Sequence, residues 1–171
     1  MNFNPFYDRI FLWGMPGSGK STFGSRLARQ LNCGFTDLDL YIEHAAGQTI
    51  PQIFRNSGED EFRLMEHKAL QEVIDRKRGV IATGGGTPCF FEQASLMKQA
   101  GLTIFMDVPV EVLSKRVAGR TGRPLLDKSS DQYIKLSQIR ESRLPFYEMA
   151  HIRFKKEPAD LLEQIDRYFS R

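Results

Sequence analysis

The stretch Gly14-Met-Pro-Gly-Ser-Gly19-Lys20-Ser21 decides the fold. It fits the pattern G-x-x-x-x-G-K-[ST], follows the apolar run Ile10–Trp13 and opens a segment with helical apolar spacing. Glycines let the backbone wrap closely, so its N–H groups can point at phosphate oxygens, and the helix N-terminus adds the positive end of its dipole. A glycine-rich turn with an incidental lysine does not account for the whole pattern in this setting. The sequence therefore predicts a site for ATP or GTP.

The roles within this segment follow from the chemistry of its side chains. We expect the Lys20 ammonium to bridge the β- and γ-phosphates and the Ser21 hydroxyl to bind Mg²⁺. Trp13, just before the glycine-rich turn, is interpreted as a packing residue. The expected nucleotide contacts in this segment are Gly14, Met15, Pro16, Gly17, Ser18, Gly19, Lys20, Ser21 and Thr22.

Outside this segment, short apolar runs alternate with segments of helical spacing. Strands are expected at Ile10–Trp13, Gly34–Asp37, Gly79–Thr83, Leu102–Asp107 and His151–Phe154. Helices are expected after Gly19, through Phe62–Ile74, over Phe91–Ala100, Pro109–Ala118 and Asp131–Ala150, and from Ala159. This alternation predicts a single α/β domain, 1–171, in which helices cover both faces of a parallel sheet.

Composition narrows the function classes. The 171 residues are 41% hydrophobic and 26% charged, and the formal net charge is only +3. We expect no nucleic-acid partner, because the net charge is small and most Lys and Arg residues are interleaved with Asp and Glu instead of forming a basic face. We also expect no membrane partner, because no apolar run is long enough to span a bilayer and Met1–Asp8 does not read as a signal peptide. The mild charge and the lack of a dimer-like apolar stripe favour a monomer.

Cysteine and histidine usage adds no metal or disulfide framework. Cys33 and Cys89 are interpreted as free thiols in a reducing cytoplasm. The three histidines show no ligand spacing, and no role is assigned to His44, His67 or His151.

The position of a metal-holding acid is open at this point. The third expected strand ends without an acid, so two alternatives remain. Asp107 follows an apolar strand, but capping the next helix is the favoured interpretation for it. Asp37 and Asp39 follow the second strand, at the edge where ligands bind in such sheets, and helix capping competes for one of them.

Several separated segments together resemble the shikimate kinase family in order and spacing, from Ile10 to about Pro158. They are Gly14–Thr22, Phe35-Thr-Asp37-Leu-Asp39, Phe62-Arg63, Ala82-Thr-Gly84-Gly85-Gly86, Arg123-Pro124-Leu125 and Arg143-Leu-Pro145-Phe-Tyr147. The resemblance implies a three-layer α/β/α P-loop kinase fold with a five-stranded parallel sheet in the order 2-3-1-4-5. It also implies a substrate-binding subdomain at about 38–67 and a mobile lid at about 119–131.

The implied reaction is phosphorylation of shikimate by ATP with Mg²⁺, giving shikimate 3-phosphate on the route to chorismate and aromatic amino acids. The resemblance implies that the catalytic residues are Lys20, Asp39 and Arg123, and that the metal is held by Ser21 and Asp37. The implied shikimate contacts are Asp39, Arg63, Gly84, Gly85, Gly86 and Arg143. Further ATP contacts are implied for Arg120, Arg123 and Lys156.

These roles also make chemical sense. Arg63 and Arg143 can grip a carboxylate through planar bidentate hydrogen bonds. Three consecutive glycines suit a backbone that something approaches closely. A basic cluster lies beside Gly119 and Gly122 and suits a loop that closes over phosphates and excludes water; its members are Lys115, Arg116, Arg120 and Arg123. Arg140 is interpreted as a surface or salt-bridging residue.

Two other function classes remain as alternatives. One is a kinase for another small acceptor, such as gluconate or a nucleoside monophosphate, and the other is a nucleotide-binding module without catalysis. The glycine triplet and the Arg143–Tyr147 segment favour shikimate. The presence of Lys20, Ser21, Asp39 and Arg123 favours an active enzyme.

Overall fold

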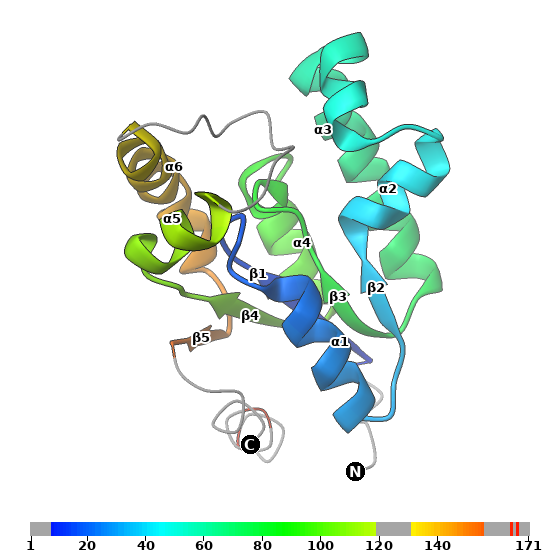
Figure 1. The fold of residues 1–171 in the computed structure, drawn as a ribbon. Helices are drawn as coiled ribbons and strands as arrows, with labels where there is room; N and C mark the ends of the chain where they lie inside the picture. The colour runs from blue at the N-terminus through cyan, green and yellow to red at the C-terminus, as the bar shows by residue number, and fades with distance from the viewer. Residues whose placement is uncertain (1–7, 119–130, 156–164, 166, 168–171) are drawn as a thin grey trace.

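A computed structural model describes residues 8–118, 131–155, 165 and 167 of the chain. Five parallel strands form one sheet in the order β2-β3-β1-β4-β5, as predicted (Figure 1). The strands are β1 (Arg9–Trp13), β2 (Phe35–Asp37), β3 (Gly79–Ala82), β4 (Leu102–Met106) and β5 (Ile152–Phe154).

Helices connect the strands in the expected alternation. They are α1 (Lys20–Gln30), α2 (Leu38–Ala46), α3 (Ile50–Arg76), the 3-10 turn η2 (Thr87–Cys89), α4 (Gln93–Ala100), α5 (Val110–Ala118) and α6 (Asp131–Tyr147). Ile165 and Arg167 are also helical, whereas most of the helix expected from Ala159 lies outside the described residues. No helix in the described ranges has the length and apolar character that a bilayer span requires.

The sheet is covered on both faces because alternate side chains of a strand point to opposite sides. Phe11 and Trp13 of β1 belong to a buried cluster with residues of α2 to α6. Ile10 and Leu12 belong to a second cluster with residues of α1 and with Ile165. One cluster lies on each face of the sheet, between the sheet and the helices, which gives the three-layer architecture. Trp13 is fully buried in the first cluster, so it is the packing residue that the sequence predicts.

The parallel register brings the carboxyl ends of the strands to one edge. Ala82 of β3 pairs with both Leu12 of β1 and Asp37 of β2, and Trp13 pairs with Phe105 of β4. The loops that follow β1, β2, β3 and β4 therefore leave the sheet on the same side. This edge is where ligands bind in open parallel sheets.

The helix before β3 is longer than the apolar pattern indicates. It begins at Ile50, after Thr49, whose backbone N–H donates to Gln52 Oε1 at 2.8 Å. Gly58 interrupts it with a non-helical backbone (φ 82°, ψ 177°), so α3 consists of two arms. The sequence pattern identified only the second arm: the first has Ile50, Ile53 and Phe54 at helical spacing, but it spans only about two turns before Gly58.

Other element ends differ by a few residues from the sequence expectation. The helix expected over Phe91–Ala100 begins at Gln93, because Phe91 and Glu92 adopt left-handed backbone angles (φ 49° and 55°) after the unpredicted turn η2. The helix expected to reach Ala150 ends at Tyr147.

Candidate functional site

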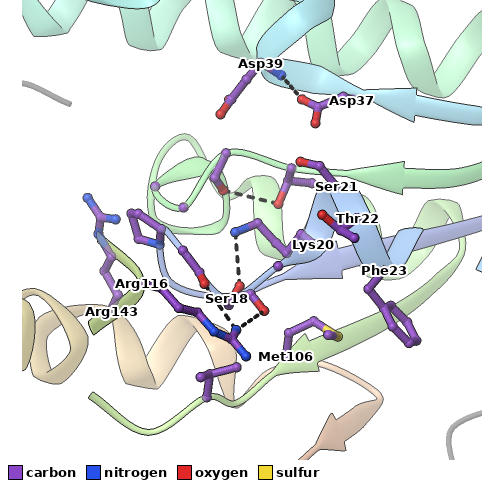
Figure 2. Close-up of a pocket in the computed structure, with 18 of the residues that line it drawn as sticks. Ser18, Lys20, Ser21, Thr22, Phe23, Asp37, Asp39, Met106, Arg116 and Arg143 are labelled. Atoms are coloured by element: carbon purple, nitrogen blue, oxygen red, sulfur yellow. Dashed lines mark hydrogen bonds between the residues drawn. The ribbon is translucent and has the colours of Figure 1, made fainter. Parts of the chain in front are cut away.

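A cleft of about 1240 Å³ lies at the carboxyl edge of the sheet. Its walls come from the Gly14–Ser21 turn, α1, α2, both arms of α3, the loop after β3, the end of β4, α5 and α6. In the view of Figure 2, Asp37 and Asp39 lie on one side of the cleft and Arg116 on the other, with Lys20 and Ser21 between them. The cleft thus collects most of the residues predicted from the sequence.

The glycine-rich turn has the backbone that its sequence demands. Gly14, Gly17 and Gly19 have φ values of 142°, 82° and 92°, a region that side-chain-bearing residues rarely adopt. A Cβ on Gly14 would lie 2.7 Å from the carbonyl oxygen of Met106, so β4 also requires a glycine there. The turn therefore brings its backbone to the mouth of the cleft and ends at the N-terminus of α1.

Lys20 is the first residue of α1 and is only 8% exposed. Its ammonium donates to the carbonyl oxygens of Gly14 (2.8 Å) and Met15 (3.1 Å) and to Ser18 Oγ (3.4 Å). The ammonium is thus already directed into the concave side of the turn. Ser21 and Thr22, by contrast, are exposed at the cleft.

Asp37 and Asp39 both line the cleft, and Asp37 also has a role in the fold. Asp37 is the N-cap of α2: its Oδ1 accepts from the backbone N–H groups of Asp39 (3.1 Å) and Leu40 (3.3 Å). The capping alternative is therefore correct for Asp37. Because both bonds use Oδ1, the other oxygen of the carboxylate takes no part in the cap.

Arg63 is buried in the second arm of α3, with 6% exposure. Its guanidinium pairs with Glu66 Oε2 at 2.8 Å and Glu59 Oε1 at 3.0 Å, and it lies 4.3 Å from the ring centroid of Phe90. Burial alone would lower the pKa of Arg63, but the charges and hydrogen bonds of Glu66 and Glu59 raise it. Arg63 is therefore a fixed cation and not the solvated charge that a lone helical arginine usually is.

Glu66 is a site residue that the sequence analysis missed. It is fully buried, it pairs with Arg63, and it accepts a hydrogen bond from Thr87 Oγ1 at 2.6 Å. A buried carboxylate of this kind holds its partner in place, because losing one member of such a pair leaves an uncompensated charge at a cost of about 3–5 kcal/mol. The i, i+3 spacing to Arg63 is the only sequence signal that could have indicated it.

The glycine triplet lies against these charged side chains. A Cβ on Gly84 would lie 2.7 Å from Glu66 Oε1 and 2.8 Å from Asp39 Oδ1, and one on Gly86 would lie 2.6 Å from Arg63 Nη2. The prediction that something approaches the triplet closely is confirmed. The groups that approach Gly84 and Gly86 are polar side chains of the cleft itself, and the group that approaches Gly85 is the ring of Pro16.

Arg143 lines the cleft from α6, and Arg140, one turn earlier, does not. Arg140 instead pairs with Asp107 Oδ1 at 2.8 Å, while Arg153 pairs with Asp107 Oδ2 at the same distance. The salt-bridging interpretation of Arg140 is confirmed. The capping interpretation of Asp107 is wrong, because both carboxylate oxygens bind arginines and α5 begins only at Val110.

Arg116 of α5 belongs to the basic cluster predicted beside the lid, but it was not among the arginines selected as phosphate contacts. Its Nη1 donates to the carbonyl oxygens of Gly17 and Ser18, both at 3.4 Å, so its charge lies against the glycine-rich turn. The arginines selected from the sequence, Arg120 and Arg123, lie outside the described residues, as do Lys156 and the expected lid.

The oxygen donors present fit a magnesium ion better than a metal caged by protein. In the described part of the chain, no three His, Cys, Asp or Glu side chains gather to hold a metal. Ser21 and Asp37 offer two oxygen donors to the same cleft. Mg²⁺ usually takes one or two protein oxygens and completes its shell with water and phosphate oxygens.

Comparisons with known proteins agree with this geometry. A model of the shikimate kinase family matches residues 16–170. The chain is 41% identical to the shikimate kinase of Phocaeicola vulgatus, covering 92% of this chain and 91% of the relative. It is 38% identical to the shikimate kinase of Aquifex aeolicus, covering 92% of this chain and 93% of that relative.

Solved structures give the same result. A shikimate kinase from Acinetobacter baumannii in complex with shikimate is similar with a TM-score of 0.86 at 35% identity, covering 95% of this chain and 93% of that chain. A gluconokinase from Sinorhizobium meliloti has a TM-score of 0.57 at 17% identity, covering 94% of this chain and 90% of that one. The second likeness extends to the fold alone.

Proposed function

Because the chain belongs to the shikimate kinase family, we propose that it transfers the γ-phosphoryl group of ATP to shikimate, giving ADP and shikimate 3-phosphate. The observation that carries the proposal is that one cleft combines a phosphate-binding turn with Arg63, Arg143 and the carboxylate of Asp39. The product is an intermediate on the route to chorismate and aromatic amino acids.

On the acceptor side, the proposed ligands of the shikimate carboxylate are Arg63 and Arg143. A guanidinium presents parallel N–H donors that match a carboxylate, and Arg63 is already fixed by Glu59 and Glu66. We assign the ring hydroxyls to Asp39 and to the backbone of the glycine triplet Gly84–Gly86, whose missing side chains let Asp39 and Arg63 lie close to that backbone.

On the donor side, we assign the phosphates to the turn Gly14–Thr22. Lys20 would exchange the carbonyl oxygens of Gly14 and Met15 for the β- and γ-phosphate oxygens, a change of partner that keeps its charge at the same place. Arg116 adds a cation beside the turn. The resemblance adds Arg120, Arg123 and Lys156 from the segments outside the described residues.

The chemical step needs positioning and charge neutralisation more than a strong base. Asp39 would accept a hydrogen bond from the attacking hydroxyl and orient it toward the γ-phosphate. Arg123 is proposed to close over the phosphates with the lid at about 119–131, while residues at about 38–67 form the substrate-binding subdomain. Bound Mg²⁺, held by Ser21 and Asp37, would neutralise phosphate charge.

The setting proposed for the enzyme is a monomer in the cytoplasm, without nucleic-acid or membrane partners. Cys33 and Cys89 are free thiols, which is consistent with a reducing compartment. Burial raises the pKa of Cys89 to about 11 although the charges of Arg143 and Arg63 oppose it, so this thiol stays protonated beside the acceptor site.

Product identification tests the proposal. The protein is incubated with ATP and Mg²⁺, with and without shikimate, and products are followed by phosphorus NMR and mass spectrometry. We expect ADP and a shikimate monoester in equal amounts, and only slow ADP formation without shikimate. ATP binding without any shikimate ester would instead indicate a kinase for another acceptor or a non-catalytic module.

A further inference from the structure

The last residue of α6, Tyr147, is fully buried and does not line the cleft. Its ring stacks on Phe105 of β4, with centroids 5.0 Å apart. Its hydroxyl donates a hydrogen bond to the carbonyl oxygen of Gly85 and lies 3.8 Å from the sulfur of Met15. One buried hydroxyl thus touches the glycine triplet and the phosphate-binding turn.

Gly85 is held from the other side as well. A Cβ on Gly85 would lie 2.7 Å from Cδ of Pro16, so the triplet packs directly on the phosphate-binding turn. Gly85 is therefore confined between Pro16 and the hydroxyl of Tyr147. A shift of either neighbour changes the place of the backbone that we assign to shikimate.

Arg143 lies one helical turn before Tyr147, so the two side chains project from the same face of α6. Burial raises the pKa of the Tyr147 hydroxyl far above its ordinary value, although the charge and hydrogen bonding of Arg143 oppose this. The hydroxyl therefore stays protonated and able to donate.

We propose that Tyr147 is a positioning residue that holds Gly85 of the acceptor site in register with the phosphate-binding turn. The proposal rests on the function proposed above. Tyr147 does not touch the reacting atoms; it sets the place of the Gly85 backbone, which we assign to the ring hydroxyls of shikimate, relative to the nucleotide site. The alternative is that Tyr147 serves only to pack the core against Phe105, a role for which its ring would suffice without the hydroxyl.

The substitution Tyr147→Phe separates the two readings, because it keeps the ring and removes the hydroxyl. Tyr133→Phe is a matched control: Tyr133 lies on the same helix, is 46% exposed, and bonds Glu111 Oε1 at 3.1 Å. For Tyr147→Phe we expect the KM for shikimate to rise about tenfold and the KM for ATP to change by less than about twofold. Tyr133→Phe should leave both constants unchanged.

A purely structural role gives a different result. Loss of folded enzyme lowers kcat through the active concentration and moves neither KM, so unchanged KM values for Tyr147→Phe would overturn the proposal. All assays are run well below the unfolding temperature of each variant.

Amide hydrogen exchange provides a readout that does not depend on turnover. The turn after the triplet is closed by bonds from Thr87 N to Gly84 O and from Cys89 N to Gly86 O. In Tyr147→Phe we expect these amides to exchange about tenfold faster, while those of β1 keep their rate. Unchanged exchange at Thr87 and Cys89 would contradict the positioning role, whereas wild-type protein that does not phosphorylate shikimate would contradict the proposed function instead.

Discussion

The nucleotide half of the cleft is one continuous segment, Gly14–Thr22, whereas the acceptor half is assembled from α2, α3, the loop after β3 and α6. In the first, function resides in the local backbone: left-handed glycines and a helix N-terminus. In the second, it resides in side chains held by partners far away in the chain. The phosphate-binding turn therefore depends mainly on its own backbone conformation. The acceptor half depends on the side chains that hold its binding residues in place.

This difference predicts that substitutions in the two halves have separable effects. The largest effect is expected for Lys20→Ala in the nucleotide half. Removing the cation at the β- and γ-phosphates should lower kcat about a thousandfold, since one preorganised charged donor is lost. Shikimate binding, measured by calorimetry without nucleotide, should stay within about twofold of wild type. A comparable loss of shikimate affinity would show that the two halves are not separable.

Arg143→Lys acts on the acceptor half. Lysine keeps the charge but loses the bidentate geometry, so we expect the KM for shikimate to rise roughly 10- to 100-fold. The KM for ATP should remain within about twofold. Steady-state kinetics with each substrate varied in turn measures both constants.

Arg55→Lys is the matched control for that change. Arg55 is exposed on the first arm of α3 and does not line the cleft, so its replacement should alter neither KM. If Arg143→Lys behaves like Arg55→Lys, Arg143 does not bind the carboxylate.

Gly86→Ala tests the contacts behind the acceptor half. The backbone of Gly86 (φ −95°) suits alanine, but the new Cβ would lie 2.6 Å from Arg63 Nη2. Glu59 and Glu66 fix the guanidinium at this place, so it can make room for the new Cβ only by moving out of its binding position. We therefore expect the KM for shikimate to rise about five- to tenfold. Kinetics with both substrates should show no change in the KM for ATP.

Gly85→Ala sharpens the same comparison. Its Cβ would meet Pro16 of the phosphate-binding turn, so both KM values should rise. Equal effects of the two alanine substitutions would contradict the different neighbours that the structure gives to Gly85 and Gly86.

The smallest effect is one on stability through Asp107. Partial burial would raise the pKa of this carboxyl, but hydrogen bonds and charges from Arg140 and Arg153 lower it overall. A lowered pKa stabilises the fold above the unfolded value of about 3.9, and this stabilisation is lost as the pH falls below it. We expect Asp107→Asn to reduce the free energy of unfolding by about 1–3 kcal/mol at pH 7 and by less as the pH falls below about 4.

Urea unfolding between pH 3 and pH 7 measures that change. Glu141→Gln on the exposed face of α6 is the control, and it should leave the free energy of unfolding at pH 7 within about 0.5 kcal/mol of wild type. A destabilisation by Asp107→Asn that is the same at every pH would show that its charge is not the cause.

The same contrast explains what the sequence could predict. The phosphate-binding turn was predictable because eight consecutive residues contain its whole geometry. The sheet was predictable because parallel strands follow from the alternation of apolar runs and helices, and its order from the family resemblance. The sequence also indicated that helix capping competes with metal binding for one of Asp37 and Asp39, although it did not show for which.

The supporting contacts of the acceptor half were not predictable in this way. Glu66 and Thr87 lie 21 residues apart, and Tyr147 and Gly85 lie 62 apart, so only the fold brings each pair together. Arg116 was lost among neighbouring basic residues, because charge spacing does not indicate which side of α5 meets the phosphate-binding turn. Asp107 was misread because its arginine partners belong to α6 and β5.

The central claim, that this acceptor half is built for a hydroxylated ring acid, is tested most directly by comparing acceptors. ADP release is measured with shikimate, gluconate and AMP at fixed ATP and Mg²⁺. We expect a kcat/KM for shikimate at least about a hundredfold above the other two: AMP has no carboxylate for the arginines, and gluconate presents its carboxylate and hydroxyls on a flexible open chain and not on a rigid ring. An equal or higher kcat/KM for gluconate or AMP would contradict it.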